Sequence, residues 1–122
     1  MNTEILNIIP VLPSADISRD IEWYKERAGF EARYADKMYA VLYRGDICLH
    51  LQWHADTEND PLLGGSVIRI DVKNIRSIFD EFVARGTVDV NGLRENTPWG
   101  TNEFGFFDLN RNAIFVMEET SI

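Results

Sequence analysis

The sequence has little of what several kinds of chemistry require. One cysteine, Cys48, excludes an intramolecular disulfide, and its place inside an apolar run is typical of a small buried side chain. With only two histidines, catalytic triads and histidine-rich metal sites have few possible members. The sequence also lacks the glycine-rich loops that hold phosphates and the Gly-x-Ser-x-Gly nucleophile motif. These absences weigh against most nucleophilic and nucleotide-dependent enzymes.

Long apolar runs and positive charge are scarce as well. The sequence contains no run of 18 apolar residues, so no membrane span is predicted. The start, Met-Asn-Thr-Glu, lacks the features of a secretory signal. We therefore expect a cytoplasmic protein without a membrane partner. Acidic residues outnumber basic ones by 20 to 12, which gives a net charge of -8 without a basic stripe. We expect no nucleic-acid partner, and the acidic surface favours cationic small molecules.

One structural pattern occurs twice along the chain. Residues 14–30 and 71–86 each read as a short helix that begins with a polar cap and ends at Ala-Gly or Arg-Gly. Each predicted helix follows one apolar strand and precedes several more strands. Two such copies, placed side by side, are expected to enclose a groove.

The repeat predicts an α+β fold in a single domain over residues 1–122. Its two β-α-β-β-β units span about 5–54 and about 65–119, and a polar linker over about 55–64 joins them. We expect a mostly antiparallel, cupped sheet with the helices on its outer face.

Local signals place the individual elements. A helix is predicted over 17–28, with Ser14 or Asp16 as its cap, and a second from the cap Asn74 to Arg85. Hairpin turns are expected at 44–46 and 110–112. Alternation and apolar runs predict the strands, over about 5–12, 31–34, 39–43, 47–53, 67–72, 87–91, 103–108 and 113–118.

This order of elements resembles the vicinal oxygen chelate superfamily, which includes glyoxalase I, extradiol dioxygenases and the bleomycin resistance proteins. The residues that carry the resemblance are Ile9 to Asp16, Trp23-Tyr24, Ala28-Gly29-Phe30, Tyr39 to Asp46, Pro98-Trp99-Gly100, Glu103-Phe104 and Phe107-Asp108. The set from Pro98 onward is most similar to the bleomycin-resistance branch. The resemblance implies a homodimer with exchanged N-terminal strands, whose grooves between subunits bind a cationic glycopeptide antibiotic without transforming it.

The resemblance also provides a test for a metal site. In the enzymes of the superfamily, four inward side chains hold a divalent metal, and the matching positions here are about Ile9, His50, Val67 and Phe115. Only His50 can bind a metal. His54 lies about 13 Å further along an extended strand, too far to complete the same site. We therefore expect no metal and no cofactor, although an enzyme of this fold with a rebuilt metal site around His50 remains an alternative.

Aromatic side chains dominate the candidate ligand-binding residues. A planar ligand needs flat apolar walls with a few polar anchors. The aromatic candidates are Tyr34, Tyr39, Trp53, Trp99, Phe104 and Phe106, and the resemblance supports Tyr34, Tyr39 and Trp99 as groove residues. The polar candidates are His50, on the groove floor, and Arg69 and Asp71, which share a strand face with Val67.

Structural roles are also open for several of these residues. His50 can be a histidine at a pocket edge whose ring nitrogens are hydrogen-bonded within the protein. Trp99 can pack on a sheet edge, and Arg69 can form an ion pair with Asp71. Arg33 and Lys37, beside the first two tyrosines, reduce the attraction for a strongly cationic ligand.

Together these features predict a metal-free, non-catalytic homodimer that sequesters a planar, basic small molecule such as a bleomycin-family antibiotic. Two alternatives remain open. One is a metal-dependent lyase, isomerase or dioxygenase of the same fold, and the other is a sensor of a different small molecule.

Overall fold

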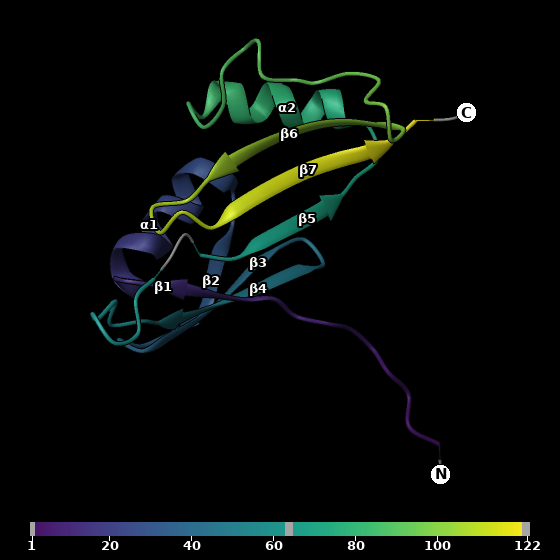
Figure 1. The fold of residues 1–122 in the computed structure, drawn as a ribbon. Helices are drawn as coiled ribbons and strands as arrows, with labels where there is room; N and C mark the ends of the chain where they lie inside the picture. The colour runs from purple at the N-terminus through teal and green to yellow at the C-terminus, as the bar shows by residue number, and fades with distance from the viewer. Residues whose placement is uncertain (1, 63–64, 121–122) are drawn as a thin grey trace.

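A computed structural model describes residues 2–62 and 65–120, and Figure 1 shows their arrangement. The first half of the chain forms a four-stranded sheet in the order β1-β4-β3-β2, with one helix. Its elements are β1 (Val11–Ser14), α1 (Ile17–Ala28), β2 (Glu31–Ala35), β3 (Tyr39–Arg44) and β4 (Ile47–Trp53). Strand β1 pairs parallel with β4, and the other two pairings are antiparallel.

The second half repeats this pattern with one strand fewer. Its elements are β5 (Val67–Asp71), α2 (Ile75–Ala84), β6 (Thr101–Phe107) and β7 (Ala113–Glu119), and the sheet order is β5-β7-β6. The α+β fold is therefore confirmed. The predicted strand over 87–91 is wrong, because Asp89 starts a tight turn in which its carbonyl accepts a hydrogen bond from the Gly92 amide. The chain between α2 and β6 is a loop.

The N-terminal segment also differs from its prediction. The strand expected over 5–12 begins only at Val11, and residues 2–10 run away from the rest of the chain (Figure 1). Pro10 and Pro13 lack the amide hydrogens that a strand needs for pairing on both sides. Only the Pro10 carbonyl joins the sheet here, where it accepts a hydrogen bond from the His50 amide at 2.9 Å. We call residues 2–10 the N-terminal arm.

The two helices begin in different ways. As predicted, Asp16 caps α1, and its side chain accepts a hydrogen bond from the Arg19 amide at 3.0 Å. Asn74 precedes α2 as expected, but its side chain makes no capping hydrogen bond. The Glu118 carboxylate of β7 instead accepts from the amides of Asn74 and Ile75, at 2.7 and 3.3 Å. A tertiary contact therefore replaces the local cap.

Both helices and one face of each sheet share a single apolar core. It contains Tyr24 of α1, Leu49 of β4, Phe82 of α2 and Ile114 of β7, all almost fully buried. We call the sheet faces that enter this core the inner faces. Because side chains alternate along a strand, the opposite face of each sheet points away from the core. We call these the first open face, on β1-β4-β3-β2, and the second open face, on β5-β7-β6.

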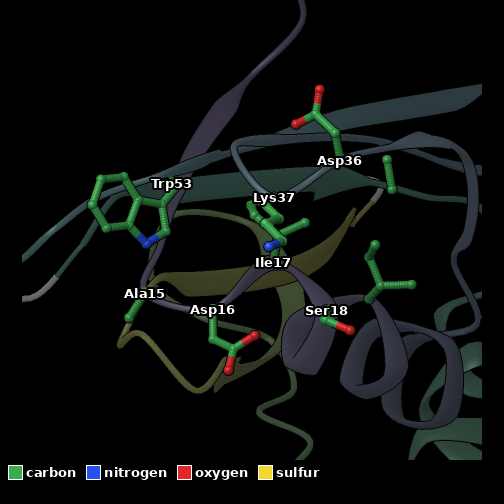
Figure 2. Close-up of a pocket in the computed structure, with 9 residues that line it drawn as sticks. Ala15, Asp16, Ile17, Ser18, Asp36, Lys37 and Trp53 are labelled. Atoms are coloured by element: carbon green, nitrogen blue, oxygen red, sulfur yellow. The ribbon is translucent and has the colours of Figure 1, made fainter.

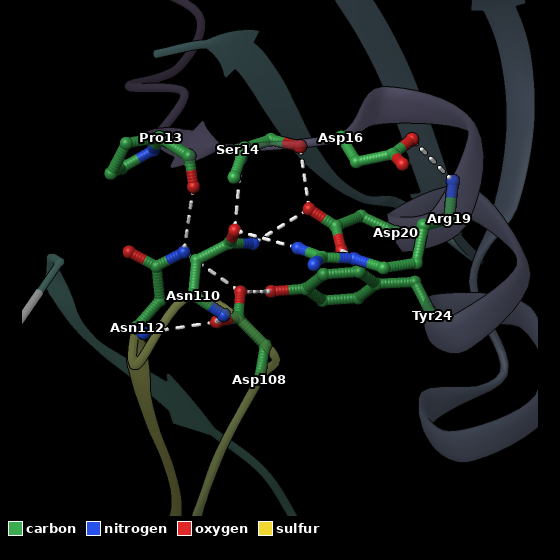
Figure 3. A network of polar contacts seen from close by, with 10 residues as sticks. Pro13, Ser14, Asp16, Arg19, Asp20, Tyr24, Asp108, Asn110 and Asn112 are labelled. Carbon is green, nitrogen blue, oxygen red and sulfur yellow. Dashed lines mark hydrogen bonds and ion pairs between the residues drawn. The ribbon is translucent and has the colours of Figure 1, made fainter. Parts of the chain in front are cut away.

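A buried polar network joins the turn between β6 and β7 to the first half (Figure 3). The Asp108 carboxylate accepts hydrogen bonds from the Tyr24 hydroxyl at 2.6 Å and the Asn112 amide group at 2.8 Å. Asn110 donates to Asp20 at 2.6 Å, and Asn112 also donates to the Pro13 carbonyl at 3.0 Å. Burial, together with the neighbouring Asp108 charge, raises the pKa of Tyr24. This network fixes the two halves relative to each other.

A second cluster joins the halves at the ends of the helices. Arg44 donates two hydrogen bonds of 2.6 Å to the two oxygens of Glu81, and Arg85 donates to Glu81 at 2.8 Å. Arg85 also donates to the carbonyls of Lys25 and Glu26 at the end of α1. The hydrogen bond from Arg44 is the largest influence on Glu81, and with Arg85 it lowers the pKa of Glu81 to about 2.

Two further predictions concern the linker and the membrane. Within the predicted linker, residues 58–59 form a turn between the bridged residues Thr57 and Asp60, the rest of 55–62 is irregular, and residues 63–64 lie outside the described part of the chain. Neither helix in residues 2–62 and 65–120 combines the length and apolar character that crossing a membrane requires.

Candidate functional site

The first open face brings together side chains from β3 and β4. Tyr39 and Val41 of β3 lie next to His50 of β4, because Val41 and His50 are direct partners in the antiparallel pairing. The Tyr39 hydroxyl lies 2.7 Å from Nδ1 of His50. Two of the predicted site residues therefore form one hydrogen-bonded pair, in which His50 is half-buried.

A bulge in β2 adds two more side chains to this face. The pairing with β3 shifts between Ala32 and Tyr34, so the side chains of Arg33 and Tyr34 both lie on the first open face. The Arg33 guanidinium lies 4.0 Å from the centre of the Tyr43 ring. Tyr34 is exposed and donates a hydrogen bond of 2.5 Å to Asp36. This bond raises the pKa of Tyr34 and lowers the pKa of Asp36. The face thus presents flat rings with few uncompensated charges.

The second open face is built around an ion pair. Arg69 of β5 donates a hydrogen bond of 2.7 Å to Glu103 of β6, and its guanidinium lies 5.3 Å from the ring centre of Phe115. The alternative ion pair between Arg69 and Asp71 is not formed, since Arg69 is bound to Glu103. Glu103 is absent from the predicted set of site residues. Its place in the Pro98-Trp99-Gly100…Glu103-Phe104 segment is the sequence signal that could have identified it.

Trp99 lies above this ion pair. Its indole nitrogen donates to Glu103 at 3.3 Å, and the Arg94 guanidinium lies 4.7 Å from the ring centre. With 56% of its surface exposed, Trp99 is not packed away on the sheet edge. Together with Arg69 and Met117 it lines an open pocket of about 450 Å³. The second open face thus offers a ring surface beside charged groups.

The acidic residue that lines this pocket is Glu119, and Glu103 lies buried beside the pocket, bonded to Arg69, Trp99 and Thr101. Burial of the Glu103 carboxylate raises the pKa, but hydrogen bonds from Thr101, Trp99 and Arg69 outweigh that effect and lower the pKa below its ordinary value. The carboxylate is therefore charged at neutral pH, and it forms an ion pair with Arg69.

Three predicted site residues lie elsewhere. Phe104 is 3% exposed and packs edge-on against Phe79 and Phe82 in the core, and Phe106 packs against Trp23 and Phe82. These two predictions are corrected here. Side chains alternate along β6, so Glu103 and Gly105 lie on the open face, whereas Phe104 and Phe106 lie on the inner face.

Trp53 lies on the helix side of its sheet, away from Tyr39 and His50. It lines an open pocket of about 580 Å³ between the start of α1 and the loop that joins β2 to β3. Figure 2 shows its ring across this pocket from Asp36 and Lys37, with Asp16 below. Trp53 therefore belongs to a different surface from the other predicted aromatic residues.

The four positions that match the metal ligands of related enzymes are divided between the two open faces. Ile9 lies in the N-terminal arm, His50 on the first open face, and Val67 and Phe115 on the second. Within residues 2–62 and 65–120, no three histidine, cysteine, aspartate or glutamate side chains come close enough to hold a metal ion.

Curated proteins similar to this sequence are bleomycin resistance proteins. Those of Geobacillus stearothermophilus and Staphylococcus aureus are each 23% identical to this chain over 129 aligned positions, covering 94% of this chain and 98% of the relative. No family model matches the chain.

Solved structures share the arrangement of both halves. A bleomycin resistance determinant encoded on transposon Tn5 is 19% identical and superimposes with a TM-score of 0.79 over 94% of this chain and 98% of that one. A bleomycin-binding protein complexed with bleomycin is 20% identical, with a TM-score of 0.77 over 94% and 99% of the two chains. The chain has the fold of the bleomycin resistance proteins. The fold that the resemblance implied is thereby confirmed.

The same fold occurs in proteins with other names. A glyoxalase-related enzyme from Clostridium phytofermentans is 13% identical, with a TM-score of 0.73 over 96% of this chain and 97% of that one. Since one fold can carry different activities, the function must be argued from the side chains on the open faces.

Proposed function

We propose that this protein binds a bleomycin-like antibiotic and sequesters it without chemical change. The observation that carries the proposal is the likeness to bleomycin resistance proteins along 94% of the chain. The positions that match metal ligands in related enzymes also favour binding over catalysis, because three of the four carry apolar side chains.

The side chains of the two open faces fit such a ligand. Tyr39 and Trp99 offer ring surfaces on which planar heteroaromatic groups stack. Glu119, which is exposed and lines the pocket beside Trp99, is a carboxylate that a basic group on a ligand can approach. The net charge of -8 raises the local concentration of cationic ligands near the whole protein.

We further propose that the binding unit is a homodimer. Each open face points away from the shared core, so the two open faces of one chain cannot close on each other. A two-fold dimer places the first open face of one subunit against the second open face of its partner, and does so twice. This arrangement encloses two equivalent grooves, with one ligand for each chain.

The N-terminal arm supports the dimer. Ile5, Leu6 and Ile8 are 86%, 82% and 88% exposed in a single chain. Three neighbouring aliphatic side chains exposed to this degree favour burial against another surface. We assign that surface to the partner subunit, which makes the arm the exchanged N-terminal segment. We place the dimer in the cytoplasm, where a lone thiol such as that of Cys48 stays reduced.

Titration of the purified protein with bleomycin tests the binding function. We expect calorimetry to give saturable binding at one ligand per chain, and mass spectrometry to recover the ligand unchanged. Absence of binding to folded, dimeric protein would overturn the proposal. Conversion of bleomycin, or of another ligand, with bound metal at one ion per site would favour the enzyme alternative.

Analytical ultracentrifugation tests the dimer separately. The triple substitution of Ile5, Leu6 and Ile8 by serine is expected to shift the protein toward monomers, because it removes the apolar side chains of the arm. Substitution of Asn2, Thr3 and Glu4 by serine is the matched control and should leave the dimer intact. Equal association of both variants would contradict the role of the arm.

A further inference from the structure

The core contains a largely enclosed cavity of about 220 Å³, between the two helices and the inner faces of both sheets. Its walls are mainly aliphatic and aromatic side chains, among them Phe30, Leu49, Ile70, Phe82 and Phe106. The cavity opens toward neither Trp99 nor the pair of Tyr39 and His50. It is therefore separate from the open faces to which we assign the antibiotic.

The walls of this cavity offer almost no polar partner. Its one charged residue is Arg44, whose guanidinium already donates to both oxygens of Glu81 and to the Ala28 carbonyl. The other polar group, the Tyr24 hydroxyl, donates to Asp108. Water needs two to four polar partners in a buried site, and an apolar cavity of about 150 Å³ in another protein stays dry and binds benzene. A cavity of this size and chemistry favours apolar ligands over water.

A route into the cavity lies at the seam between the two sheets. Ile47, Leu49 and Ile70 line the cavity and also line a second pocket, of about 250 Å³, next to Ile8 and Pro10 of the N-terminal arm. Ile47 lies at the start of β4, beside the hairpin turn, and is 41% exposed. Rotation of an exposed aliphatic side chain takes nanoseconds or less, so Ile47 is a small barrier to entry.

We propose that this cavity is a second ligand site, which takes a small apolar molecule of the size and class of a monocyclic aromatic hydrocarbon. Binding there depends on dispersion contacts with the packed walls and on removal of apolar surface from water. It requires no open-face residue and no antibiotic, so it stands or falls independently of the proposed function.

A methyl NMR titration of the full-length protein with benzene tests the proposal. We expect saturable shifts at the methyl groups of Ile47, Ile70 and Ile114, and a rise in the melting temperature of about 3 °C or more near saturation. Absence of saturable shifts in the parent protein would overturn the proposal. Shifts confined to side chains beside Trp53 or Trp99 would also overturn it, because they would place the probe on the surface.

Two alanine-to-leucine substitutions distinguish benzene binding in the cavity from effects of added side-chain volume elsewhere. Ala28 and Ala84 are the last residues of α1 and α2, but only Ala28 is buried and lines the cavity. A28L is expected to abolish the benzene response and A84L to preserve it. Retention of the full response by A28L would contradict the site. If A28L fails to fold, V72L fills the same cavity from the end of β5 and carries the same expectation.

Discussion

The two open faces have the same geometry and different chemistry. On the first, the parallel pairing of β1 and β4 sets Val11 beside His50, and on the second the pairing of β5 and β7 sets Arg69 beside Phe115. The first face gathers rings around a hydrogen-bonded tyrosine–histidine pair, whereas the second gathers an ion pair beside an exposed tryptophan. The repeat therefore determines where side chains lie, and the individual residues determine what each face can bind.

The two open faces can act together only if both halves of the chain unfold as one cooperative unit. Substitution of Asp108 is expected to have the largest effect on this unit. We expect D108A to lower the free energy of unfolding by about 3 kcal/mol, because the buried Tyr24 hydroxyl and the Asn112 amide lose their partner. Urea unfolding followed by circular dichroism measures the change. D46A, in the exposed turn between β3 and β4, should change stability little. Equal effects of the two substitutions would show that the buried network does not hold the halves together.

The second face is expected to dominate ligand affinity through Trp99. We expect W99A to weaken bleomycin binding about 30-fold, or about 2 kcal/mol, because exposed aromatic anchors are frequent hot spots. W53A, on the helix side of the first sheet, is the matched control, with a loss of less than about 3-fold. Calorimetry with bleomycin measures both. A larger loss in W53A would move the site to the pocket of Figure 2.

The junction of the two halves at the helix ends predicts a dependence on pH. The pKa of Glu81 falls from 4.5 to about 2 on folding, so its carboxylate stabilises the protein above pH 4.5. That contribution is lost as the pH falls from about 4.5 toward 2. Because Glu81 is one-third exposed, we expect about 1 kcal/mol.

Unfolding in urea between pH 5 and pH 2 tests this dependence. The parent protein should lose about 1 kcal/mol more than E81Q over this range. E95Q removes a more exposed carboxylate, which lies 3.6 Å from Arg76, and should behave like the parent. If E81Q and the parent lose stability equally as the pH falls, Glu81 does not contribute.

The smallest expected effect concerns the first face. Y39F removes the hydrogen bond between the Tyr39 hydroxyl and Nδ1 of His50, and we expect a loss of about 0.5 kcal/mol, because both groups are partly solvated. Nitrogen NMR of the His50 ring should report a changed balance of tautomers. Y43F, on the same face, should leave that spectrum unchanged. An unchanged His50 spectrum in Y39F would show that the contact does not form in solution.

Elements with strong local signals were predictable from the sequence. The helix from Ile17 to Ala28 has a capping aspartate and a terminal glycine, and both hairpin turns have turn-forming residues. The segment over 87–91 carries alternating Val88 and Val90, but no neighbouring strand pairs with it. Whether a segment pairs with another strand depends on the tertiary structure, so the alternation by itself led to a wrong prediction there.

The candidate site was predictable in part for a similar reason. Residue types and the resemblance indicated Tyr39, His50 and Trp99, which the structure distributes over the two open faces. Trp53, Phe104 and Phe106 were assigned to the groove by their aromatic character, although a shift of one position along a strand reverses the face. Glu103 was left out because its role depends on Arg69, which lies 34 positions away in the chain.

The sequence by itself determined the repeat, the helices with their ends, the turns and the apolar strands, because these depend on neighbouring residues. Only the tertiary structure decided which face of each strand meets the core, and it decided that both inner faces share one core. It also paired Arg69 with Glu103 and left a cavity between the halves. The physical reason is that burial and ion pairing depend on groups distant in the chain, whose positions no local pattern contains.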